Sequence, residues 1–282
     1  MTFELEKKIP KPEKLIPFGE ELTMEEIYDR FSGKNNEENI VSLWFRDWDD
    51  TKRALVADLA DGIVAYVPES EICVEKLKYV DERDIPLQAL SLIHKTAYAS
   101  IIDIQDNVVT LSRKELQKNV LNELVIGETY DVCIKSITSL GVFVDIGAGI
   151  TGFIANSEIA ITPFNSPEDI VETYGFFKGK KIQAKLLAIK SGKTKLSFRR
   201  SLNFPHLVKG DATSGIVRNR LSDNSGYFVD ISPNDTAIVD VPFELNYGER
   251  ILVEIKASTS ICEEDDYIVK HHAKFRIRLN NN

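Results

Sequence analysis

The sequence predicts an all-β protein of three tandem five-stranded barrels, preceded by a short charged extension that contains one helix. Two observations support this prediction. Short motifs recur at offsets of 85–87 residues, and apolar and polar residues alternate over short runs between glycine-containing turns. The recurrence indicates repeated units, and the alternation is typical of half-buried strands. We expect the middle unit to be the most regular and the outer two to be divergent copies.

The repeat is clearest in three pairs of motifs. GVFVDI at 141–146 returns as GYFVDI at 226–231, Ser70-Glu71-Ile72 returns at 157–159, and the LSRK of 111–114 resembles 196–199. These pairs define an N-terminal extension and three units, the last of which is shortened. The expected boundaries are 1–39, 40–120, 121–206 and 207–282. The connections at 119–124 and 203–209 are expected to be short linkers that limit motion between units.

The extension is rich in charge and contains Pro10, Pro12 and Pro17. Thr23 and Glu26 form a capping-box pattern that predicts a helix over about 24–32, and Gly33 is a natural end for it. The first residues carry charges and lack an apolar core, so they do not resemble a secretory signal.

The middle unit has the clearest pattern of elements. Strands are expected near 128–139, 141–146, 150–155, 180–189 and 194–199, with a helix between the third and the fourth. Ser166 is the expected N-cap of that helix, Pro167 its first residue and Gly175 its end. Five strands with a helix in this position describe an OB-type Greek-key barrel.

The second and third strands of this unit form a hairpin around Gly147-Ala148-Gly149. A ladder symmetric about Ala148 pairs Val144 with Gly152 on the core side and Phe143 with Phe153 on the other side. A slip of one residue would expose the whole apolar set, so the register is strongly specified. Two phenylalanines are therefore predicted side by side away from the core, where they face a ligand or are covered by another part of the chain.

The distribution of charge sets the middle unit apart. The chain has a net charge of −9, yet residues 178–200 contain nine basic residues and no acidic one. A stripe of one sign is typical of a phosphate-binding surface, although lysine runs also occur as solvated faces. Aromatic rings beside lysines are the combination that unpaired bases and their phosphates require.

These features resemble the S1 domain family of RNA-binding modules, named after a large protein of the bacterial small ribosomal subunit. The resemblance runs from Gly127 and Tyr130 through GVFVDIG and GFIANSEI to KTKLSFRR. It implies single-stranded RNA as the ligand, stacking on Phe143 and Phe153, and basic contacts from the last hairpin. The residues expected to make these contacts are Lys193, Lys195, Arg199, Lys180 and Lys181. The sequence departs from the family pattern at Leu140 and Ala155, where an aromatic residue and a histidine are frequent.

The outer units match more weakly. In the first, Val56 occupies the position of Phe143 while Tyr66 matches Phe153. In the third, Phe228 matches Phe143, and the counterpart of Phe153 is expected near Val239. Both outer units are net acidic, so a protein-contact or spacing role is favoured for them, with RNA binding through Tyr66 and Phe228 as the alternative.

No catalytic function is predicted. His94, His206, His271 and His272 have no triad-like spacing, and neither a phosphate-binding loop nor a nucleophile elbow is present. We expect no cofactor and no metal site. Three widely spaced cysteines and the absence of a long apolar run favour a cytoplasmic protein without membrane contact.

Taken together, the sequence predicts a non-enzymatic protein that binds single-stranded RNA through its middle barrel, in translation or RNA metabolism, with the ribosome or another protein as a further partner. The alternative is a structural adaptor whose degenerate barrels are assembly surfaces. Single-stranded DNA as the ligand is a third possibility.

Overall fold

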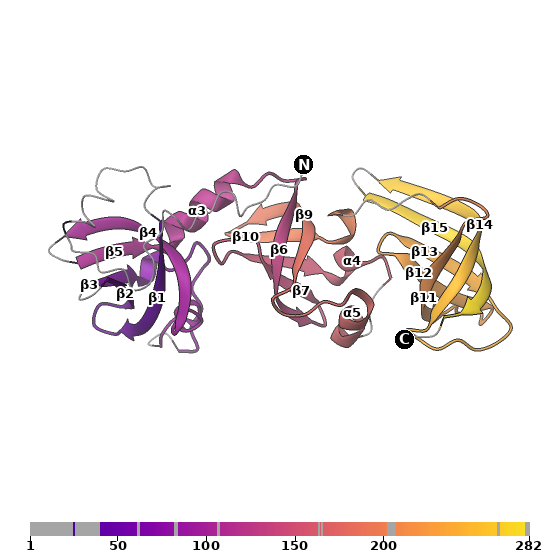
Figure 1. Ribbon diagram of the computed structural model, residues 1–282, viewed down its shortest axis with the longest axis horizontal. Helices are drawn as coiled ribbons and strands as arrows, with labels where there is room; N and C mark the ends of the chain where they lie inside the picture. Colours follow the sequence, from indigo (N-terminus) through magenta and orange to yellow (C-terminus); the bar gives the residue numbers. More distant parts are fainter. Residues whose placement is uncertain are drawn as a thin grey trace.

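The computed structural model describes residue 25 and the ranges 40–60, 63–81, 84–105, 108–162, 164, 166–201, 207–263 and 266–279. Three closed five-stranded barrels lie in a row along the long axis (Figure 1). In chain order the strands of each barrel are numbered one to five, and in every barrel the spatial order is 1-2-3-5-4. The predicted fold class is thereby confirmed. The helix expected over 24–32 lies outside the described residues apart from Glu25.

The first barrel consists of five strands and is followed by a helix, with two short helical segments between its third and fourth strands. In order the elements are β1 (Ile40–Asp49), β2 (Ala54–Ala60), β3 (Ile63–Pro68), η4 (Glu69–Glu71), α2 (Leu87–Leu90), β4 (Lys95–Gln105), β5 (Val108–Ser112) and α3 (Arg113–Glu123).

The middle barrel agrees closely with the expected elements. Its strands are β6 (Thr129–Thr138), β7 (Gly141–Asp145), β8 (Thr151–Ala155), β9 (Lys181–Lys190) and β10 (Lys193–Ser197). Helix α5 (Pro167–Tyr174) begins after Ser166, which forms a full capping box with Asp169, and ends at Gly175 in the left-handed conformation. Two short segments, α4 (Asn156–Ile159) and η5 (Arg199–Ser201), were not predicted.

The third barrel lacks a helix between its third and fourth strands within the described residues, which agrees with its shorter sequence. Its strands are β11 (Ala212–Arg220), β12 (Gly226–Ser232), β13 (Asp235–Asp240), β14 (Arg250–Glu263) and β15 (Asp266–Arg278). The last two form a long hairpin in which Glu263 pairs with Asp266 next to the turn.

Each barrel has its own apolar core, formed by the inward-facing residues of alternating strands. In the middle barrel Val142, Val144 and Ile154 are completely buried. Gly152 faces the same interior, where an added Cβ would lie 2.4 Å from Leu196 and 2.8 Å from Val144. A glycine is needed here because the two neighbouring side chains already fill the space.

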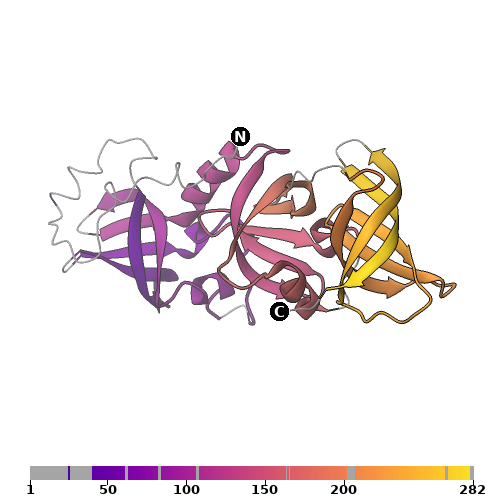
Figure 2. The same ribbon diagram turned by 45° about the vertical axis from the view of Figure 1, so that its right-hand side comes forward.

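The connection expected to be a linker at 119–124 was predicted wrongly. Residues up to Glu123 belong to helix α3. Ser112 is the N-cap of this helix, and its hydroxyl accepts a hydrogen bond from the Glu115 amide. Helix α3 lies between the first and the middle barrel in both views (Figure 1, Figure 2). The sequence signal was missed because a weakly amphipathic helix between two barrels resembles a polar connection. The second predicted linker, 203–209, lies mostly outside the described residues.

Polar contacts join the middle barrel to the third. The Arg218 guanidinium forms a buried ion pair with Asp230 at 2.8 Å, and the same arginine donates to the Thr173 hydroxyl of helix α5 at 2.9 Å. Asp230 also accepts a hydrogen bond from the Thr162 hydroxyl. Removing one partner of a buried ion pair lowers the free energy of unfolding by about 3–5 kcal/mol. Because Arg218 and Asp230 also bind residues of the middle barrel, the same cluster stabilises the third barrel and fixes its orientation.

No helix within the described part of the chain is both long and apolar enough to cross a membrane.

Stability of the third barrel is expected to fall as the pH drops below about 6.5. His271 is 2% exposed, its Nδ1 lies 2.8 Å from the Ser258 hydroxyl, and burial lowers its pKa from the ordinary value of 6.5. The unfolded chain therefore binds a proton more readily than the folded barrel, so acidification favours unfolding. Urea unfolding of the third barrel, measured above and below pH 6.5, tests this.

The matched variants are His271→Gln and His272→Gln, because His272 is the exposed neighbour in the same strand. The first should flatten the pH dependence and the second should leave it unchanged. Equal pH profiles in both variants would show that His271 does not titrate differently in the folded protein.

Candidate nucleic-acid interface

The hairpin of β7 and β8 places the two predicted aromatic residues side by side. Phe143 pairs directly with Phe153, and Val144 pairs with Gly152, so the predicted register is confirmed. The ring centroids lie 4.9 Å apart with 44° between the ring planes. Both side chains are half-buried, whereas their neighbours Val142 and Ile154 are fully buried on the opposite face. The strand period therefore leaves a ring pair with partial access to solvent.

Gly141 allows the chain to pass beneath this ring pair. Its φ is +146°, and an added Cβ would lie 2.1 Å from the Ile154 carbonyl oxygen and 3.0 Å from the Phe153 ring. Any other residue would push the two strands apart or displace the ring, because an L side chain rarely adopts this φ. The first glycine of the GVFVDI motif is thus a positioning requirement of the aromatic pair.

The turn between the strands has a second function besides reversing the chain. Gly147, Ala148 and Gly149 have φ values of +131°, +51° and +79°, which closes a tight loop stabilised by a hydrogen bond from the Ile150 amide to the Gly147 carbonyl. The carbonyl of Ala148 points to helix α3 and accepts hydrogen bonds from Arg113 at 3.2 Å and Gln117 at 3.0 Å. The hairpin that carries the rings is therefore fixed against the first barrel.

Lys195 is the basic residue nearest to the rings in the strand register. It is exposed, and it pairs with Phe153 in the parallel ladder between β8 and β10. Ser136, Phe143, Phe153 and Lys195 consequently form one row across four strands. Lys193, which precedes Lys195 by two residues on the same face, is also exposed and forms an ion pair with Glu75 of the first barrel at 3.5 Å. Both lysines thus lie on the same face of the barrel as the ring pair.

Lys180 directly precedes strand β9 and Lys181 is its first residue, and Lys181 lies farther from the rings in the ladder than Lys195. The Lys180 ammonium donates to the carbonyls of Tyr174 and Gly175 at 3.0 Å and 2.9 Å, so it stabilises the C-terminal end of helix α5. Lys181 is exposed and pairs with Cys133 in the ladder between β6 and β9.

Arg199 differs from the expected RNA contact. Its side chain is 5% exposed and donates to the Ser157 carbonyl at 2.8 Å and to Asn234 of the third barrel at 3.4 Å. Glu158 lies 3.8 Å away and also binds Arg200 in a bidentate ion pair. The expectation for Arg199 has to be corrected, because a buried guanidinium at a barrel interface is not accessible to RNA. The prediction counted the basic residues of 178–200 together and could not include the partners of Arg199, which lie 42 and 35 positions away in the chain.

The outer barrels retain only part of this arrangement. In the first, Tyr66 pairs with Val56, which is 7% exposed, and the Lys52 ammonium lies 3.7 Å from the centre of the Tyr66 ring. In the third, Phe228 pairs with Ile238. The counterpart expected near Val239 is its neighbour Ile238, since Val239 is fully buried. Among the described residues, neither outer barrel pairs two aromatic residues across its second and third strands.

Two residues of these outer faces were missed in the sequence. Lys52 precedes strand β2, and no local pattern connects a turn lysine to a ring 14 positions later. His272 pairs with Ile238, in the position that Lys195 takes beside Phe153. The register between β13 and β15 was needed to see this correspondence.

The part of the chain with this geometry also matches a known family of sequences. Residues 123–201, which contain the aromatic hairpin and the lysine-bearing strands, match the family model of the S1 RNA binding domain. The chain carries an S1 domain and resembles bacterial ribosomal protein S1. Over 205 residues it is 30% identical to the small ribosomal subunit protein bS1 of Staphylococcus saprophyticus, covering 67% of this chain and 48% of that protein. Over 209 residues it is 27% identical to the bS1 homolog of Bacillus subtilis, covering 68% and 50% respectively.

The chain thus spans about half the length of these curated relatives. Among solved structures, a multidomain protein with nucleic acid binding domains from Streptococcus pneumoniae is similar over 83% of this chain and 72% of that chain, with 13% identity and a TM-score of 0.24. The S1 domain of residues 123–201 is the barrel that carries the ring pair.

Arg199→Ala is expected to lower the stability of the protein by about 1–3 kcal/mol, because it leaves the Ser157 carbonyl without a donor at a buried interface. Lys195→Ala is the matched control, since it removes an exposed cation from the same segment. Chemical unfolding followed by tryptophan fluorescence and circular dichroism measures both. Equal stability of the two variants would assign Arg199 to the surface.

Proposed function

We propose that this chain binds single-stranded RNA through its middle barrel and catalyses no reaction. Phosphates are attracted by the lysines beside the rings, and unpaired bases stack on Phe143 and Phe153. The observation that carries the proposal is the row in which the two rings, 4.9 Å apart, are followed by the exposed Lys195. The match of residues 123–201 to the S1 RNA binding domain supports the same conclusion.

Stacking and charge have separate roles in this mechanism. Every base offers a flat π face, so stacking on the two rings contributes about 1–3 kcal/mol per base and discriminates little among sequences. Phosphate contacts add affinity that depends on salt. The net negative charge of the outer barrels disfavours phosphate binding at sites other than the basic region, which limits indiscriminate binding. Lys195 and Lys193 are the proposed phosphate contacts, and Lys181 is a more distant one.

The proposed setting is translation or RNA turnover in the cytoplasm, with the ribosome or another protein as a further partner. The relatives named as small ribosomal subunit proteins support this setting. We assign one functional unit to each barrel, over 40–120, 121–206 and 207–282, after the extension 1–39. Tyr66 and Phe228 remain candidate single-ring contacts of the outer units.

A second candidate function, that of a protein adaptor, is favoured for the outer barrels by their faces. Val56 and Ile238 replace one ring of each pair, so these faces have lost half of a stacking surface. Purified protein that carries no RNA, fails to bind an oligonucleotide at low salt and forms a defined oligomer would support the adaptor. Comparing RNA with DNA of one sequence tests the choice of nucleic acid, because the 2′-hydroxyl is the systematic difference in the sugar.

Phe143→Ala and Phe153→Ala are each expected to weaken binding of a single-stranded RNA by about 1–3 kcal/mol, because one stacking surface is lost. Fluorescence anisotropy with a labelled oligouridylate measures the change. Leu140→Ala is the control, since Leu140 is 74% exposed in the turn preceding β7 and has no ring. Unchanged affinity in both phenylalanine variants, with the fold intact, would remove the ring pair from the binding surface.

Binding should also weaken as salt rises. If about four phosphates are neutralised, the logarithm of the binding constant falls against the logarithm of salt with a slope of roughly −3. Titrations at several salt concentrations measure this slope. A slope near zero would show that the lysines do not take part in RNA binding.

A further inference from the structure

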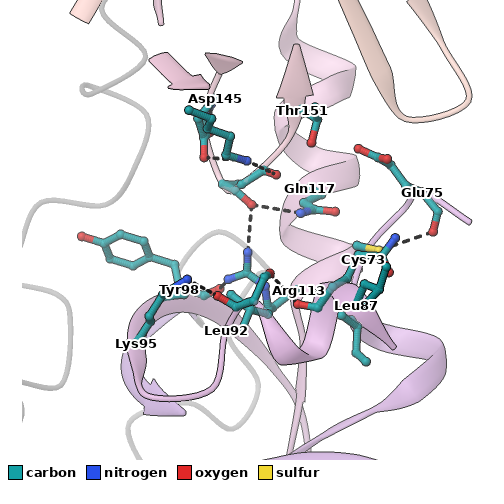
Figure 3. A pocket seen from close by; sticks show the side chains of 18 of the residues that line it. Cys73, Glu75, Leu87, Leu92, Lys95, Tyr98, Arg113, Gln117, Asp145 and Thr151 are labelled. Atoms are coloured by element: carbon teal, nitrogen blue, oxygen red, sulfur yellow. Dashed lines mark hydrogen bonds and ion pairs between the residues drawn. The ribbon is translucent and has the colours of Figure 1, made fainter. Parts of the chain in front are cut away.

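A cleft of about 850 Å³ lies between the first and the middle barrel. One wall is formed by the segment after η4, by α2, by the start of β4 and by α3. The other wall is formed by Lys135, Asp145, the turn at 147–149, Thr151 and Lys178 of the middle barrel (Figure 3). Both walls are held together by the hydrogen bonds from Arg113 and Gln117 to the Ala148 carbonyl. The cleft is thus a fixed feature of the barrel contact.

The lining of this cleft is strongly cationic in an otherwise acidic chain. Five basic side chains face two carboxylates, and both carboxylates are already engaged: Asp145 lies 3.4 Å from Lys135, and Glu75 lies 3.5 Å from Lys193. Lys78 and Lys178 are exposed and have no ion-pair or hydrogen-bond partner for their ammonium groups within the described residues. An excess of positive charge between two low-dielectric walls attracts anions more strongly than an open surface does.

Arg113 adds a buried positive charge to this lining. It is 5% exposed, and its guanidinium donates to the carbonyls of Tyr98 at 2.7 Å and Ala148 at 3.2 Å, as Figure 3 shows. Its Nε has no hydrogen-bond partner, and no carboxylate lies within ion-pair distance among the described residues. Asp145 compensates this buried charge through space without a direct ion pair, so a further anion in the cleft would stabilise it more.

The cleft begins close to the ring pair along the same hairpin. Asp145 and Thr151 line it, and they pair with each other two residues along from Phe143 and Phe153 on the same face of the hairpin. Two residues of a strand span about 7 Å. A polynucleotide stacked on the rings therefore meets the cleft within about one nucleotide of chain.

We infer that this cleft binds the phosphate backbone of the same RNA strand whose bases stack on Phe143 and Phe153, so that the first barrel contributes to the RNA site through Lys78. This inference rests on the proposed function. It gives the first barrel a role in RNA binding that its incomplete ring pair does not suggest. The contact between the barrels then sets the direction in which the strand leaves the middle barrel.

The test compares a double variant of the cleft, Lys78→Ala with Lys178→Ala, with a matched control. The control is Lys76→Ala with Lys209→Ala, which removes two exposed lysines that do not line the cleft and so has the same net charge. Both are made in the full chain, and thermal unfolding checks that each is folded. Labelled oligouridylates of about 4 and about 12 nucleotides are titrated at several salt concentrations, since OB barrels bind about 4–16 nucleotides and the two lengths differ in how far they extend past the rings.

We expect the cleft variant to bind the longer RNA roughly tenfold more weakly at low salt, with a salt slope shallower by about 1.4 because two phosphate contacts are lost. The shorter RNA reaches only the edge of the cleft and should lose less affinity than the longer one, whereas both RNAs should change less than about twofold with the control. A cleft variant that behaves like the control on the longer RNA would overturn the inference.

Failure of this inference is distinguishable from failure of the proposed function. If Phe143→Ala weakens binding but the cleft variant does not, the middle barrel binds RNA without the cleft. If the unmodified chain binds neither RNA, both conclusions fail. Competition by oligoglutamate as strong as that by RNA of equal length would also overturn the inference, because it would identify the cleft as a site for an acidic peptide.

Discussion

The tight turn at Gly147-Ala148-Gly149 is the constraint on which the functional architecture depends. Three consecutive residues with positive φ close the β7–β8 hairpin and fix its register. The register then sends Val144 and Ile154 into the core and Phe143 and Phe153 to the other face. The same turn presents the Ala148 carbonyl to Arg113 and Gln117, so one short loop both orients the rings and attaches the first barrel.

The basic residues of 178–200 also have several different structural roles. Arg199 and Arg200 hold Glu158 and the edge of the third barrel, Lys180 stabilises the end of helix α5, and Lys193 pairs with Glu75 across the first interface. The basic residues of this segment are therefore divided between contacts within the protein and positions exposed to solvent. The exposed positive charge of this segment is smaller than its nine basic residues suggest. Lys78, Lys95 and Lys135 from other segments lie near Lys178 in the cleft and add to it.

The two barrel interfaces explain how three similar units can have different roles. The second interface uses buried polar groups, Arg218 with Asp230 and Thr162, which demand one orientation because an unpaired buried charge is costly. The first leaves an open cationic cleft beside the ring pair. The middle barrel is thus joined to the third barrel through buried polar groups and to the first barrel through hydrogen bonds at the edge of a cleft.

The amino-acid sequence by itself determined the barrel class, the hairpin register, the outward Phe143 and Phe153, and the limits of helix α5. Each depends on patterns spanning a few residues, namely strand alternation, positive-φ glycines and a capping box. Only the tertiary structure decided that Arg199 is buried, that 119–123 is helical, and that Lys78 and Lys178 face one cleft. In these cases the decisive partners lie far along the chain or in another barrel, and no local pattern encodes which distant atoms will neutralise a charge or cover a side chain.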